Sequence, residues 1–134
     1  MKNNIDVVNQ WVDKSKEDLD MAKRAIAFQP FYTASCCFHC QQSAEKLLKA
    51  TLIFFEYEIT KDLKTHNLNL LVSLLENHIE LDFDFHYWID ELNDYGVKPR
   101  YPTDTGQPTY SEAEEAILIC QKIFDYLIKH LTFQ

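Results

Sequence analysis

Glycine and proline are scarce, because the 134 residues contain only two glycines and four prolines. All-β folds depend on many tight turns, so this scarcity disfavours them and favours long helices. Gly96 and Gly106 also lack the spacing of a Walker loop or of a dinucleotide-binding glycine fingerprint. The sequence therefore predicts an all-α chain without a glycine-rich nucleotide loop, and no cofactor is expected.

Long apolar runs are missing as well. No stretch of about 18 apolar residues occurs, so neither a transmembrane helix nor a membrane partner is expected. The opening residues lack the apolar core of a signal peptide, which predicts a cytoplasmic location. In that reducing compartment the four cysteines are expected to be free thiols. The length fits one helical domain over residues 1–134.

Basic residues are outnumbered: 13 Lys and Arg stand against 21 Asp and Glu, which gives a formal net charge of −8. Such a surface repels a phosphate backbone on average, so contact with nucleic acid would need a local basic patch. The GxSxG and HExxH motifs are also absent, which excludes the usual acyl-transfer and zinc-protease signatures.

Apolar residues recur at steps of three and four, which predicts an antiparallel up-and-down bundle of about five helices. The most apolar helix, the second, is expected to touch several neighbours. A long loop over residues 96–108, which holds both glycines and three prolines, is expected before the last helix. The five helices are predicted at about Asn4–Phe28, Phe31–Tyr57, Leu68–Ile79, Asp82–Tyr95 and Ser111–Leu131.

Capping residues mark three of the helix starts. Asn67 or Thr65 is predicted to cap the third helix, and His66 is an alternative cap. Asp82 and Asp84 indicate an acidic start of the fourth helix, which we favour over a hard-cation site that would include His86. The run Ser111–Glu114 matches a capping box at the start of the last helix.

Cysteine and histidine residues offer one candidate metal site. Cys36, His39 and Cys40 are spaced to share one face of the second helix, and Cys120 from the last helix would complete a four-ligand zinc site. Zinc-site cysteines usually come as paired CxxC knuckles. We therefore favour small thiols that fill a helix interface, and no metal is expected.

The segment Gln41–Ala50, QQSAEKLLKA, places charged residues within the most apolar helix. Glu45 and Lys49 form an i,i+4 pair in the favourable orientation. From residue chemistry alone, a solvated strip with that ion pair is the favoured interpretation.

The same segment resembles the QQAAEKALKA-type signature of HEPN domains, named for higher eukaryotes and prokaryotes nucleotide-binding. Thr65–Leu68 resembles the T-H-[DN]-L step of that family, and Arg100–Pro102 resembles its R-Y-P step before the last helix. Together with residues of the first helix, these matches cover nearly the whole chain.

The resemblance implies an all-α bundle, usually a homodimer, that often acts with a small nucleotidyltransferase as toxin and antitoxin. Many members are metal-independent ribonucleases with an R-x(4–6)-H motif, in which histidine accepts a proton and arginine stabilises the phosphorus transition state. Here no histidine follows Arg100 in that window. We therefore expect binding of a nucleotide or RNA, and we do not expect the chain to be an enzyme.

Two alternatives stay open at this stage. One is a metal-independent ribonuclease toxin that pairs Arg100 with a histidine from another segment, such as His66. The other is a purely structural helical interaction module. A structural salt bridge between Arg100 and an acid such as Glu45 is also an open interpretation of that arginine. The candidate binding residues are Lys46, Lys49, His66, Lys98, Arg100 and Tyr101.

Overall fold

The structure, a computed structural model, describes residues 4–56, 64–95 and 106–131. These segments form five helices and contain no β-strand. The helices are α1 (Asn4–Ala25), α2 (Thr33–Phe54), α3 (Leu68–Leu75), α4 (Phe83–Tyr95) and α5 (Tyr110–Leu131). The predicted all-α bundle is confirmed. The first two helices are shorter than predicted at the turn that joins them, where α1 ends at Ala25 and α2 begins at Thr33.

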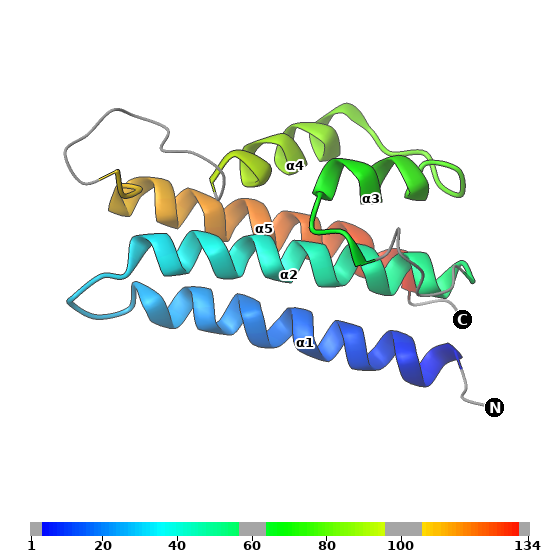
Figure 1. Cartoon of the computed structure of the whole chain (residues 1–134), viewed down its shortest axis with the longest axis horizontal. Coiled ribbons are helices and arrows are strands. Elements are labelled where there is room, and N and C mark those ends of the chain that lie inside the picture. The colour runs from blue at the N-terminus through cyan, green and yellow to red at the C-terminus, as the bar shows by residue number, and fades with distance from the viewer. Residues whose placement is uncertain (1–3, 57–63, 96–105, 132–134) are drawn as a thin grey trace.

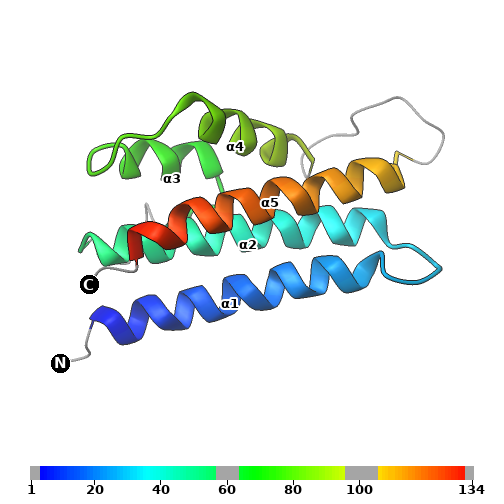
Figure 2. The same cartoon turned by 180° about the vertical axis from the view of Figure 1, so that it is seen from behind.

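The helices form three layers, with α2 and α5 side by side in the middle (Figures 1 and 2). Helix α1 covers one side of this pair, and the short helices α3 and α4 cover the other (Figures 1 and 2). Helix α1 runs antiparallel to α2, and α4 runs antiparallel to α5, whereas α2 and α5 run in the same direction (Figure 1). Helix α2 contacts each of the other four helices, which confirms the central position predicted for it.

The apolar stripes of the helices meet in one buried cluster. On α1 the buried residues are Val8, Val12, Ser15, Asp18, Leu19 and Ala22. The buried hydroxyl of Ser15 is satisfied because it donates to the carbonyl oxygen of Ser43 on α2 at 2.8 Å. The small side chains of Ser15 and Ser43, whose hydroxyl oxygens are 3.0 Å apart, let α1 and α2 approach closely here. On α5 the buried residues are Ala113, Ala116, Ile119, Cys120, Ile123, Leu127 and Leu131.

Side-chain caps fix the starts of the shorter helices. Asn67 accepts from the backbone N–H groups of Asn69 and Leu70 and so caps α3, as predicted. The Asp82 carboxylate accepts from the N–H of Phe85 at 3.0 Å, which confirms an acidic cap on α4. His86, the third member of the alternative cation site, instead bonds Glu76 at 2.8 Å.

The capping box of α5 lies two residues earlier than predicted. The Thr109 hydroxyl accepts from the N–H of Glu112 at 3.0 Å, and the Glu112 carboxylate accepts from the N–H of Thr109 at 2.8 Å. Both Thr109–Glu112 and Ser111–Glu114 match the capping-box pattern, so sequence spacing alone could not choose between them. Most of the predicted loop before α5, residues 96–105, lies outside the described residues. Among the described helices, none combines the length and apolar character needed to cross a membrane.

Candidate functional site

A buried carboxylate on α2 organises the candidate site. One oxygen of Glu45 accepts from the Lys49 ammonium at 2.9 Å, one turn further along α2. The same carboxylate lies 3.0 Å and 3.1 Å, measured from its two oxygens, from Nδ1 of His66. Glu45 therefore links the QQSAEKLLKA segment to the chain just before α3, 21 residues away.

The Glu45–Lys49 pair is buried, and the predicted solvated strip is wrong at these two positions. Glu45 is 4% exposed and Lys49 is 5% exposed. The Lys49 ammonium lies 5.7 Å from the centre of the Trp11 ring, so α1 covers it through a cation–π contact. The predicted i,i+4 pair does form, but the neighbouring helix removes it from water.

The His66 ring is held in place by a hydrogen bond at Nδ1, while most of its surface is exposed to solvent. Its side chain is 78% exposed although Nδ1 is held by the buried Glu45. Because a carboxylate only accepts, Nδ1 donates, and Nε2 is left for a ligand or for a proton. His66 is not the cap of α3, since Asn67 fills that position and leaves the imidazole free to reach α2.

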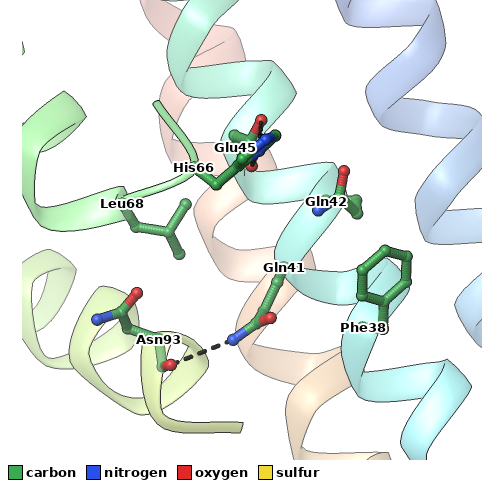
Figure 3. A pocket seen from close by; sticks show the side chains of 7 residues that line it. All are labelled: Phe38, Gln41, Gln42, Glu45, His66, Leu68 and Asn93. Carbon is green, nitrogen blue, oxygen red and sulfur yellow. Dashed lines mark hydrogen bonds and ion pairs between the residues drawn. The ribbon is translucent and has the colours of Figure 1, made fainter. Parts of the chain in front are cut away.

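A cavity of about 450 Å³ lies beside this pair, between α2, α3 and α4 (Figure 3). Helix α2 supplies four of its lining residues at a spacing that places them on one face, and α4 supplies Asn93 from across the cavity (Figure 3). The Gln41 amide donates to the carbonyl oxygens of Leu92 at 2.6 Å and Asn93 at 3.2 Å, which ties α4 to α2. The lining residues are Phe38, Gln41, Gln42, Glu45, His66, Leu68 and Asn93.

Lys46 belongs to a separate cluster between α1 and α2. Its ammonium lies 2.5 Å from one oxygen of Asp18, and the other oxygen lies 2.8 Å from Nδ1 of His39. Asp18 is buried, so the Lys46 ammonium compensates its charge and His39 gives it a further hydrogen-bond partner. Lys46 therefore joins the helices rather than lining the cavity.

Comparison with known proteins shows the family and the fold of the chain. The family model described as HEPN domain matches residues 8–131, almost the whole chain. The chain belongs to the HEPN domain family. Its fold is also similar to the crystal structure of TT1696 from Thermus thermophilus, with a TM-score of 0.76 and 22% sequence identity. That match covers 91% of this chain and 96% of the other and shows a shared fold. A search of curated proteins found no significant match.

The candidate binding residues of this HEPN domain fall into three groups. Lys49 and His66 meet on Glu45. Lys46 lies apart, on Asp18. Lys98, Arg100 and Tyr101 are outside the described residues. Of the described candidates, Lys46 and Lys49 are paired with carboxylates and do not line the cavity, whereas His66 does.

The alternative zinc site is not assembled in the part of the chain that the structure describes. Cys36, Cys40 and Cys120 are buried free thiols, but the fourth candidate, His39, bonds Asp18 instead. No group of three or more metal-ligating side chains occurs among the described residues. The Cys120 and Cys36 thiols, together with burial, raise the pKa of the Cys40 thiol. A protonated thiol is a poor zinc ligand, which agrees with a packing role for Cys40. Hydrogen bonds with Cys40 lower the pKa of the Cys36 and Cys120 thiols, and both of these side chains are buried in the core.

Six of the seven cavity residues were not predicted from the sequence as site residues: Phe38, Gln41, Gln42, Glu45, Leu68 and Asn93. Three of them share one face of α2 with Glu45, so helical spacing alone could have grouped them. Asn93 carried no such signal, because only the packing of α4 against α2 brings it to the cavity.

Proposed function

We propose that this HEPN domain binds a nucleotide or RNA at the cavity beside α2, and that His66 makes the polar contact at its mouth. The observation that carries the proposal is the exposed imidazole of His66, held through Nδ1 by a buried carboxylate. A ring fixed in this way loses little conformational entropy when Nε2 contacts a ligand. Nε2 would contact a ribose hydroxyl or a phosphate oxygen.

The charge of the site limits the mode of binding. The chain carries −8, and the described lysines of the predicted site are compensated by Asp18 and Glu45. The affinity for a nucleotide or RNA would therefore come from contacts at the cavity, and the binding constant would depend only weakly on salt concentration. The sequence resemblance supports Arg100 as an additional phosphate ligand, with Lys98 and Tyr101 beside it.

Replacing His66 with alanine tests this proposal. We expect the variant to bind a fluorescently labelled short RNA, or labelled ATP or GTP, at least about tenfold more weakly, which corresponds to about 1.4 kcal/mol. His86→Ala is the matched control, because His86 also bonds a glutamate at 2.8 Å but does not line the cavity. Equal loss in both variants, or no binding by the unaltered protein, would contradict the proposal and leave the structural interaction module as the explanation.

A second candidate function is metal-independent RNA cleavage, and the Glu45–His66 contact favours it. A buried carboxylate that holds Nδ1 of a histidine leaves Nε2 as a base, which is the arrangement needed to accept the proton of a ribose 2′-hydroxyl. Arg100 would then stabilise the charge at phosphorus.

Cleavage of a radiolabelled RNA in EDTA tests this second function. If the chain is a ribonuclease, we expect His66→Ala and Arg100→Ala each to lower the rate at least about 100-fold, the usual contribution of a general acid or base. Circular dichroism of each variant would check that the fold is intact. Absence of cleavage by the unaltered protein would exclude the enzyme and leave the binding function.

We also propose that the chain forms a homodimer and acts with a small nucleotidyltransferase, as the family resemblance implies. Exposed apolar side chains where α1 and α5 meet support a contact with a second copy. A groove of about 410 Å³ there is lined by Ile117 and Leu118 together with Lys23 and Glu114. Those two opposite charges would pair with each other across a two-fold axis.

A further inference from the structure

We propose that the cavity beside α2 takes an adenine base, with the sugar and phosphate outside it at His66. This inference rests on the proposed nucleotide binding and adds which part of the ligand enters the cavity and which base it prefers. Three properties of the cavity lining support it: its charge, its amide groups and its exposed aromatic ring.

The charge of the lining favours a neutral ring over a phosphate. Among the described lining residues, none is a lysine or arginine, and Glu45 contributes a carboxylate. The Lys49 ammonium is held by Glu45 and lies over Trp11, so it is not directed at the cavity. A phosphate in this place would lie beside the Glu45 carboxylate, which already holds Lys49, and would find no lysine or arginine among the described lining residues. An uncharged base avoids that repulsion.

Two amide side chains offer the groups that read a base edge. The side chains of Gln42 and Asn93 make no hydrogen bond with another described residue, whereas the Gln41 amide is already bonded to α4. An amide presents one donor beside one acceptor, which matches the amino group and ring nitrogen of adenine. The corresponding edge of guanine presents two acceptors, which suit an arginine or lysine instead.

Phe38 provides a stacking surface at one end of the cavity (Figure 3). Its side chain is 51% exposed, and its contact with the His39 ring is edge-on, at 76° between the ring planes. Phe38 and Gln42 are one helical turn apart, so a base stacked on the ring would lie within reach of the amide. Because a purine offers a larger face than a pyrimidine, stacking favours adenine over cytosine and uracil.

Titration calorimetry with AMP, GMP, CMP and UMP tests this inference, because the four ligands share the same sugar and phosphate. We expect AMP to bind at least about tenfold more tightly than the other three. Gln42→Leu and Asn93→Leu should each lower the affinity for AMP toward that for UMP. Phe38→Ala should weaken all four ligands about tenfold through the loss of stacking. Gln10→Leu, an exposed glutamine on α1, is the control and should change nothing.

The outcomes separate this inference from the proposed function. If all four monophosphates bind within about twofold of one another and His66→Ala weakens them all, base recognition is wrong and nucleotide binding stands. If GMP or a pyrimidine nucleotide binds most tightly, adenine is the wrong base. If the preference for AMP survives in both leucine variants with unchanged melting temperature, the amides do not read the base. If no nucleotide or RNA binds, both proposals fall together.

Discussion

Replacing Glu45 with glutamine is expected to lower the free energy of unfolding by about 3–5 kcal/mol, the usual cost of leaving a buried charge without its partner. Glu45 and Lys49 are 4% and 5% exposed, so the change would leave Lys49 buried without a carboxylate or water beside it. The same change would weaken the bond that holds His66 on α2, because a neutral amide oxygen is a weaker acceptor for Nδ1 than a carboxylate. Urea denaturation, monitored by circular dichroism, measures the decrease in the free energy of unfolding.

Two further variants show whether burial is the cause. Glu45→Met combined with Lys49→Met should recover much of the stability, because an apolar pair removes the unpaired charge. Asp20→Ala breaks an exposed i,i+4 pair with Arg24 and should change stability by less than about 0.5 kcal/mol. A loss of less than about 1 kcal/mol in Glu45→Gln would show that the pair is solvated after all.

Truncating Phe85 to alanine is expected to cost about 3–5 kcal/mol, since it removes a large aromatic side chain from the core. Phe85 is fully buried and packs against Tyr126 of α5 at 5.0 Å between ring centres, and against Trp88. Among the described side chains that are fully buried, Phe85 is the largest, and it joins α4 to α5. Because α4 also carries Asn93, a loosened α4 should weaken the preference for AMP as well.

Phe83→Ala is the matched control on the same helix, because the Phe83 side chain is 82% exposed. We expect this variant to stay within about 0.5 kcal/mol of the unaltered protein in thermal and urea denaturation. Equal destabilisation by the two substitutions would mean that α4 is not anchored through Phe85.

Most of the fold follows from patterns that are local in the sequence. Apolar spacing of three and four residues marks each helix, and the cap at Asn67 is visible in the sequence because its side chain bonds N–H groups two and three residues later. The sequence predicts the start of α5 less accurately than the start of α3. The reason is that Thr109 and Ser111 each have a glutamate three residues later, so two capping boxes are possible. Only the folded chain decides which of the two boxes forms.

The candidate site depends on contacts between distant residues, and the sequence predicts less of it. The Glu45–Lys49 pair could be predicted from its spacing, but its burial could not, because the covering residue Trp11 lies on another helix. His66 was a candidate from its motif, yet its bond to Glu45 spans 21 residues. Asn93 joins the cavity through the packing of α4, which no local pattern encodes.

The central claim is that a ligand occupies the cavity between α2, α3 and α4 and contacts His66. Backbone amide chemical shifts in a titration of ¹⁵N-labelled protein with AMP test it most directly. We expect the largest shifts at residues 38–45, 66–68 and 93, with the side-chain amides of Gln42 and Asn93 among them. Shifts confined to the face of α1 and α5, or the absence of any shift at millimolar AMP and with short RNA, would contradict the account.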